Sequence, residues 1–145
     1  MTLHSSVRCL VLAAAVALTT AAHAHAADDA LYRELGEKPG LSELMQAFVG
    51  RLKTDARVGH FFKDIKAGFL ARQLTDQICV LAGGPCVYDG EAMGPSHKDL
   101  GVARRDFNRV VEVLQDTMDD RHIAVPTQNA LLALLAPMHR EIITK

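Results

Sequence analysis

The sequence predicts an all-α protein that folds as one domain. Apolar residues recur every three to four positions in several separate segments, which is the period of a helix with one buried face. After the first residues, no segment shows the sustained alternation of apolar and polar residues that is typical of half-buried strands. The chain has no repeats or low-complexity linkers, and its 145 residues suit a single domain.

The composition is that of an ordinary globular protein. Hydrophobic residues make up 49% of the chain and the formal net charge is −1. No basic stripe runs along the sequence, so nothing in it predicts binding to the phosphates of a nucleic acid.

The N-terminal segment differs in kind from the rest of the chain. Arg8 supplies a positive charge, an almost wholly apolar stretch follows, and alanines at alternating positions come next. The apolar stretch is shorter than the ~20 residues that a membrane-spanning helix needs. We therefore predict a secretory signal peptide over residues 1–26, cleaved after Ala24 or Ala26, and a periplasmic or secreted mature domain over residues 27–145 that does not stay in the membrane. A retained N-terminal anchor helix is the alternative.

The mature chain is expected to begin with a short helix over residues 31–35. Gly36 ends it, and Pro39 and Gly40 extend the break, because glycine adopts positive φ and proline cannot donate a backbone hydrogen bond. A longer helix with one apolar face follows. The residues of that face are Leu41, Leu44, Met45, Phe48, Val49 and Leu52.

A short helical turn is expected around Phe61 and Phe62, followed by another amphipathic helix. The apolar face of this helix holds Phe69, Leu70, Leu74, Ile78 and Leu81, and Arg72, Asp76 and Gln77 are assigned to its other sides. We expect this helix to face the element that carries His97.

The segment GGPCVYDGEAMGPSH, which runs from Gly83 to His97, is predicted to be a structured loop that leads into a short helix. Met93, His97 and Leu100 fall at i, i+4 and i+7, so His97 would lie in the middle of an apolar side. There its Nε2 can bind a metal while Nδ1–H donates to an acceptor such as the Met93 carbonyl. On spacing alone, a partly buried histidine that binds no metal is the alternative.

Two more helices complete the chain. The first carries Phe107, Val110, Val111, Leu114 and Met118 on its apolar face and ends in the charged segment 119–122. Pro126 suits the first turn of the last helix. That helix carries Leu131, Leu134, Leu135, Met138 and Ile142, and Pro137 inside it predicts a kink.

Phe61-Phe62, the block GGPCVYDGEAM and His97 occur in this order, and together they resemble the truncated hemoglobins of the first group. The resemblance runs from about Leu31 to about Ile143. It implies a truncated globin fold, a two-over-two helical sandwich, around a heme that we expect to be heme b. His97 would then be the proximal ligand of a pentacoordinate iron, and Phe62 would pack flat against the heme.

A heme is a flat apolar group, so its site needs large apolar walls and a few cations at its carboxylate edge. The apolar candidates are Phe48, Val49, Phe62, Leu70, Leu74, Ile78, Met93, Phe107, Val111 and Leu135. His139, in the segment APMHR, matches a histidine that can bond covalently to a heme vinyl carbon in cyanobacterial relatives; a plain surface histidine is the alternative. Arg72 and Lys98 are possible partners of the heme propionates, although a solvated surface charge is the commoner role.

On the distal side, the sequence departs from the family pattern. The family commonly carries a tyrosine at the position of Val49 and often glutamine at those of Leu70 and Leu74. Without these donors, bound oxygen loses hydrogen bonds worth roughly 1.5–3 kcal/mol each. We therefore expect bound oxygen to dissociate faster, and the heme iron to be oxidised to the ferric state more easily, than in a relative that carries the tyrosine. Gln73 and Gln46 are the nearest remaining candidates for a donor, with surface exposure as the alternative.

The predicted function is a heme protein that binds oxygen, carbon monoxide or nitric oxide, with oxygen carriage as a candidate role. The alternatives are a nitric oxide dioxygenase or other heme redox enzyme, and an electron-transfer or gas-sensing protein whose redox partner is unknown. The apolar distal side argues against strong peroxidase activity, which needs a polar acid–base group beside the iron. A helical domain in which His97 only packs is the non-heme alternative. His60 and His122 are assigned no role.

Loss of the signal peptide removes Cys9 and leaves Cys79 and Cys86, seven positions apart across the Gly-Gly-Pro turn. An oxidising compartment would permit a disulfide between them. The sequence leaves open whether they form this bond or stay as two buried thiols, because it does not give the separation of their Cα atoms.

Overall fold

The computed structural model describes residues 29–145, and the predicted signal peptide lies outside this range. Residues 29–145 contain helices and no strand, which confirms the all-α prediction for this part of the chain. The helices are α2 (Ala30–Glu34), α3 (Glu37–Thr54), α4 (Ala67–Leu81), α5 (Met93–His97), α6 (Arg104–Asp120), α7 (Val125–Leu135) and α8 (His139–Ile142), with 3₁₀ turns at Gly59–Phe61 and Ala136–Met138. None of these helices has the length and the apolar character needed to cross a bilayer.

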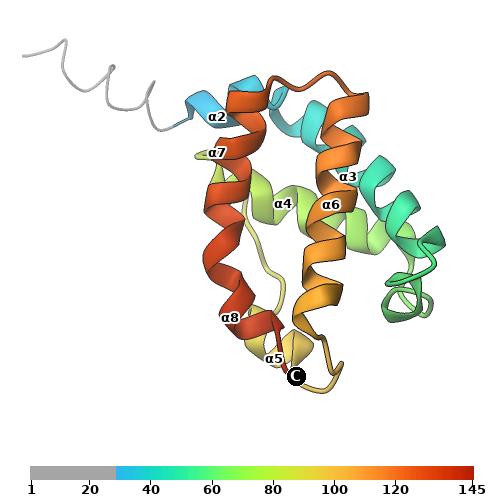
Figure 1. The fold of residues 1–145 in the computed structure, drawn as a ribbon. Coiled ribbons are helices and arrows are strands. Elements are labelled where there is room, and N and C mark those ends of the chain that lie inside the picture. Colours follow the sequence, from blue (N-terminus) through green and yellow to red (C-terminus); the bar gives the residue numbers. More distant parts are fainter. Residues whose placement is uncertain (1–28) are drawn as a thin grey trace, which may run out of the picture.

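The four long helices form two layers (Figure 1). α3 packs against both α4 and α6, and α6 and α7 run in opposite directions in front of α4. The segment between α4 and α5 descends along this assembly to the end where α5 packs against α8. The short helix that ends in His97 therefore lies at the same end of the molecule as the C-terminus.

The apolar face of α3 is the centre of the core. All six of its predicted residues are at most 5% exposed, which confirms the periodicity. The predicted break at Pro39 and Gly40 is wrong, because both lie in the first turns of α3. The first-turn N–H groups of a helix have no partner within it, so a proline there breaks no hydrogen bond. Gly36 makes the actual break, as the residue before α3, with φ of 80°.

The last apolar segment folds as two helices. α7 ends at Leu135, the 3₁₀ turn Ala136–Met138 contains Pro137, and α8 resumes at His139. The proline therefore interrupts the helix more strongly than the predicted kink, because Pro137 has no N–H to donate to the carbonyl of Ala133 and its ring clashes with that carbonyl. Pro126 lies in the first turn of α7, as predicted.

Three residues that were predicted on apolar faces are exposed, and one of them, Leu134 on α7, is 37% exposed. Phe69 is 52% exposed in the first turn of α4, where the guanidinium of Arg72 lies 5.6 Å from the centre of its ring. Leu100 is 44% exposed, because α5 ends at His97 and the chain turns before position 100 can continue the helical face. Helical spacing predicts a shared face only while the helix lasts.

Asp55, at the end of α3, organises the following turn. Its Oδ1 accepts the backbone N–H groups of Arg57 at 2.9 Å and Val58 at 3.1 Å, and its Oδ2 accepts Nε of Arg109 at 2.8 Å. The backbone N–H of Arg57 makes the largest contribution to lowering the pKa of Asp55 below its ordinary 3.8, and the side chain of Arg109 adds to the effect. Because each of these groups donates to the carboxylate, the charged form is favoured in the folded state.

We expect Asp55→Asn to destabilise the protein at pH 7. A lowered pKa in the folded state stabilises the protein above the unfolded-state pKa, and this contribution is lost as the pH falls from about 3.8 through the lower folded-state value. The difference between wild type and variant in urea midpoint should therefore shrink below about pH 4. Asp64→Asn, at an exposed loop position, is the matched control and should change stability little. A difference that stays constant down to pH 2 would contradict this role.

Candidate functional site

His97 is the last residue of α5 and is partly buried. Its Nδ1 lies 2.8 Å from the carbonyl oxygen of Met93 and 2.9 Å from Oγ of Ser96. A carbonyl oxygen only accepts hydrogen bonds, so Nδ1 carries the proton and donates, as predicted for Met93. This bond fixes the tautomer in which Nε2 presents a lone pair, which is the form that ligates a metal.

Seven of the predicted wall residues gather at the core. Phe48, Val49 and Ile78 are buried in it, and Phe62, Leu70, Leu74 and Leu135 pack against it while staying partly exposed. Leu70 and Leu74 come from one face of α4. The structure thus brings hydrocarbon from α3, α4 and α7 together, as an apolar wall requires.

Two more predicted residues meet at the end of the molecule where α5 packs against α8. The rings of Phe107 on α6 and His139 on α8 have centres 6.4 Å apart. Nδ1 of His139 lies 2.8 Å from the carbonyl oxygen of Ala136, so this imidazole also donates from Nδ1 and keeps a lone pair on Nε2. Val111 is half-buried on α6.

Gln77 is the residue of this region that the sequence analysis missed. It was assigned to a polar side of α4, yet it is only 9% exposed. Its Nε2 lies 3.8 Å from Sδ of Met93 and 4.0 Å from Sδ of Met138. Its position seven residues after Leu70 was the available signal, because that spacing returns to the same helix face. Its polarity predicts exposure, because polar residues of an amphipathic helix normally face solvent.

The two glutamines that were predicted as distal candidates differ from each other. Gln46 is exposed on α3 and donates to Oγ of Ser42 at 3.0 Å, so the structure does not bring it to this region. Gln73, on α4, is partly buried, and its Oε1 is buried without a hydrogen-bond partner among residues 29–145. Its Nε2 lies 3.5 Å from Oδ1 of Asp89. An unpaired acceptor therefore lies on the helix that carries Leu70 and Leu74.

The predicted propionate partners are both at the surface. The side chain of Lys98 is 70% exposed and lies 3.9 Å from Asp99, and Arg72 is exposed beside Phe69. Their role toward a heme stays a prediction.

Taken together, these residues fit a heme. An iron porphyrin requires one axial nitrogen, large apolar walls and few polar groups. His97 offers an Nε2 lone pair in a fixed tautomer, and α4 offers Leu70, Leu74 and the unpaired oxygen of Gln73. The contact between Gln77 and Met93 shows that α4 and the helix of His97 approach each other.

Cys79 and Cys86 form a disulfide, which settles the alternative that the sequence left open. Cys79, in the last turn of α4, is fully buried, and the Cα atoms are 5.9 Å apart. Gly84 lies against the bridge, because a Cβ there would come within 2.6 Å of both the sulfur of Cys79 and the ring of Tyr32. The bridge joins the end of α4 to the segment that leads to α5.

We expect Cys86→Ser to lower the free energy of unfolding by about 2 kcal/mol, because the bridge closes a short loop and removes entropy from the unfolded chain. Urea denaturation of wild type and variant measures this difference. A reductant should lower the free energy of unfolding of wild type by a similar amount and should leave that of the variant unchanged. Equal midpoints for oxidised and reduced wild type would contradict the expectation.

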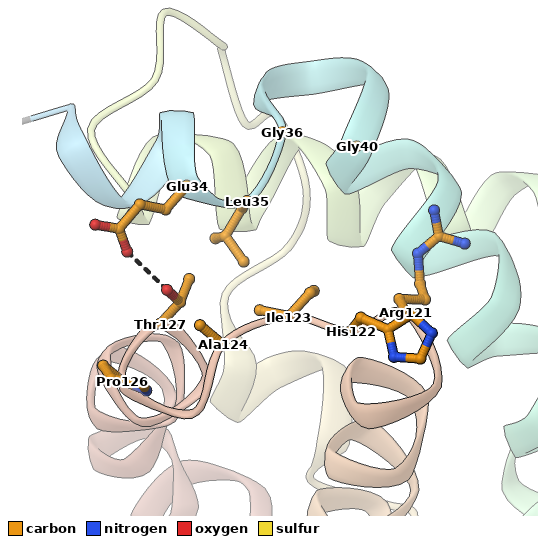
Figure 2. Close-up of a pocket in the computed structure, with 10 residues that line it drawn as sticks. All are labelled: Glu34, Leu35, Gly36, Gly40, Arg121, His122, Ile123, Ala124, Pro126 and Thr127. Atoms are coloured by element: carbon orange, nitrogen blue, oxygen red, sulfur yellow. Dashed lines mark hydrogen bonds between the residues drawn. The ribbon is translucent and has the colours of Figure 1, made fainter.

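A cavity of about 630 Å³ lies away from His97, between the α2–α3 junction and the segment that joins α6 to α7 (Figure 2). Its lining residues are Glu34, Leu35, Gly36, Gly40, Arg121, His122, Ile123, Ala124, Pro126 and Thr127. Oγ1 of Thr127 donates to Oε2 of Glu34 at 2.7 Å across it. A second cavity of about 400 Å³ lies between α3 and α4 and includes Gln46 and Arg72. Neither cavity contains His97.

Comparison with known proteins places the chain in a family. A family model described as bacterial-like globin matches residues 30–144. The group 1 truncated hemoglobin of Tetrahymena pyriformis is 25% identical over 115 residues, which cover 79% of this chain and 95% of that protein. The group 1 truncated hemoglobin GlbN of Synechocystis sp. is 30% identical over 118 residues, covering 76% of this chain and 93% of that protein.

The structural comparison agrees with the sequence comparison. The crystal structure of the truncated hemoglobin from Tetrahymena pyriformis in its Fe(III) form superposes with a TM-score of 0.75 at 25% identity, covering 79% of this chain and 98% of that one. The predicted truncated globin fold is therefore confirmed.

The solved structures of the Tetrahymena pyriformis protein include variants at one tyrosine and at two glutamines. The first glutamine follows the tyrosine by 21 positions and the second follows by four more, which is the spacing of Val49, Leu70 and Leu74 in this chain. The family match, the relatives and the fold lead to one conclusion. The chain belongs to the group 1 truncated hemoglobins of the bacterial-like globin family.

Proposed function

We propose that this chain binds heme through His97 and that the bound heme carries a diatomic gas, with oxygen transport as the leading role. A heme supplies an iron atom that binds oxygen, carbon monoxide or nitric oxide. The observation that carries the proposal is the 2.8 Å bond from Nδ1 of His97 to the carbonyl of Met93. That bond holds the imidazole ring in place and assigns the proton of the neutral ring to Nδ1, so Nε2 is the nitrogen that would bind the iron.

Three distal positions of the proposed site carry hydrocarbon side chains. Val49 is fully buried, and Leu70 and Leu74 lie half-buried on α4. These three side chains exclude water and donate no hydrogen bond. Their arrangement supports weak retention of oxygen, which demands a donor, together with ordinary binding of carbon monoxide.

Optical spectroscopy tests the proposal. The purified protein, loaded with heme, should show a Soret band in the ferric state, a five-coordinate spectrum in the ferrous state and a sharp shifted band with carbon monoxide. Failure to form a Soret band after loading would overturn the proposal.

We also propose that the protein is exported, with the signal peptide over residues 1–26 removed. The disulfide between Cys79 and Cys86 supports this location, because such bonds persist in oxidising compartments and are rare in the cytosol. N-terminal sequencing of protein from a periplasmic fraction should find a new terminus after Ala24 or Ala26. An intact Met1 on protein that stays with the cytoplasmic fraction would contradict export.

A further inference from the structure

Two methionines lie within reach of solvent at the end of the molecule where α5 packs against α8. Met93 is the first residue of α5 and Met138 directly precedes α8, and both residues are partly exposed. The other two methionines of residues 29–145, Met45 and Met118, are 0% exposed. A thioether is oxidised where an oxidant can reach it, so Met93 and Met138 are the expected sites of oxidation in the folded domain.

One buried amide approaches both of these sulfur atoms. Nε2 of Gln77 lies 3.8 Å from Sδ of Met93 and 4.0 Å from Sδ of Met138. Gln77 is 9% exposed, and a thioether sulfur is a weak acceptor, so the N–H groups of its amide keep most of their capacity to donate. A stronger acceptor on either sulfur would therefore satisfy a buried donor that the thioethers satisfy only weakly.

Oxidation of a thioether supplies such an acceptor. A sulfoxide oxygen carries a partial negative charge, so it accepts hydrogen bonds more strongly than sulfur does. An oxygen added on the side of the sulfur that faces Gln77 would lie nearer to Nε2 than the sulfur itself, toward the ~2.9–3.0 Å of an ordinary N–H···O bond. The amide has two N–H groups, so it can donate to the sulfoxide of either methionine.

We propose that Met93 and Met138 form a methionine-oxidation site in which the amide of Gln77 binds the sulfoxide oxygen. The oxidant is hydrogen peroxide. A lone pair of the sulfur attacks one peroxide oxygen, the S–O bond forms as the O–O bond breaks, and the second oxygen leaves as hydroxide. The hydroxide then takes the proton of the transferred oxygen, which yields the sulfoxide and water. The sulfur loses two electrons and the peroxide gains them.

The product joins α4 to the helix that carries His97. The carbonyl oxygen of Met93 accepts a hydrogen bond from Nδ1 of His97 at 2.8 Å, so a bond from the Met93 side chain to Gln77 connects the two helices through one residue. A sulfoxide is reduced back to the thioether by enzymes that each accept one epimer, so this connection is reversible. The proposal requires only Gln77 and the two methionines, and it does not rest on heme binding.

Peptide mapping of the folded mature protein tests where oxygen is added. Trypsin cuts after lysine and arginine and places Met45, Met93, Met118 and Met138 on four different peptides. Hydrogen peroxide is applied with cyanide present, so that a bound iron does not react with it. We expect Met93 and Met138 to be oxidised roughly tenfold faster than Met45 and Met118, which are closed to solvent. Equal rates for all four methionines would overturn the proposal.

The configuration at sulfur reports on Gln77, because a sulfoxide sulfur is chiral. A donor on one side of the sulfur favours the epimer whose oxygen it can bind, and reductases specific for each epimer measure the two forms in the peptides. In Gln77→Leu, which removes the amide, the ratio of the major to the minor epimer at Met93 should fall roughly fivefold, the equivalent of one neutral hydrogen bond. Unchanged ratios at both methionines would overturn the proposal, even if both react.

Nuclear magnetic resonance of wild type separates direct contact from a change in packing. Oxidation should move the side-chain N–H signals of Gln77 downfield, because the sulfoxide oxygen is the stronger acceptor. In the double variant Met93→Leu/Met138→Leu, peroxide should leave these signals in place. Gln46→Leu, at an exposed glutamine of α3, is the matched control and should change neither the oxidation rates nor the epimer ratios. Gln77 signals that do not move when wild type is oxidised at both methionines would overturn the proposal, whether or not Gln77→Leu folds.

Discussion

Replacing His97 with alanine is expected to abolish the native axial bond and to weaken and shift the Soret band. The substitution removes the imidazole whose Nδ1 is bonded to Met93 and whose Nε2 is the proposed ligand. Loss of groups that merely support a metal ligand costs roughly 10–100-fold in metal affinity, so loss of the ligand itself should accelerate heme loss by at least that factor. Transfer of heme to an excess of apomyoglobin measures the rate.

Chemical rescue makes this experiment specific. Free imidazole added to His97→Ala should restore a histidine-like spectrum, because the ligand can enter the space that the side chain leaves. His60→Ala is the matched control, at an exposed histidine beside Phe61, and it should change neither the spectrum nor the rate. An unaltered spectrum in His97→Ala would exclude this residue as the ligand.

The second large effect is expected on the distal side, where a donor should slow the dissociation of oxygen. Leu70→Gln introduces an amide at a half-buried position of α4, next to the gas ligand of the proposed site. A hydrogen bond to a charged group contributes about 1.5–3 kcal/mol, so the rate should fall roughly 10- to 100-fold. Stopped-flow displacement of oxygen by carbon monoxide measures it.

Volume effects need a separate control. Leu70→Met changes the shape of the side chain without adding a donor and should leave the oxygen rate within a few-fold of wild type. Carbon monoxide dissociation should change much less than oxygen dissociation in Leu70→Gln, because carbon monoxide demands less hydrogen bonding. If wild type already held oxygen as tightly as the variant, a donor would be present that Val49, Leu70 and Leu74 do not provide.

The helices themselves could be predicted from periodicity, because burial of one face fixes a repeat that the sequence displays. Leu41 to Leu52 show this most clearly, since every predicted member of that face is buried. The helix ends were harder to predict. Pro39 lies inside α3 because a first turn tolerates it, and Leu100 is exposed because α5 stops after five residues. The residues at which a helix begins and ends depend on tertiary packing, which cannot be deduced from local residue preferences.

The features of the site also differ in whether local spacing predicts them or whether they depend on tertiary contacts. The bond from His97 to Met93 followed from i, i+4 spacing within one short helix, so it could be predicted. The disulfide could not, because it depends on the distance between a helix end and a loop. Gln77 was missed because a polar residue on an amphipathic helix normally faces solvent. Only the approach of α4 to Met93 and Met138 shows that this glutamine is inside.

The bond between Cys79 and Cys86 also decides how the protein should be produced. A host that synthesises it among reduced glutathione and thioredoxin would yield the dithiol, which is heavier by two hydrogen atoms. Intact-mass spectrometry distinguishes the two forms before any ligand is added. Secretion into an oxidising medium is therefore the appropriate route to material whose gas affinity represents the natural molecule.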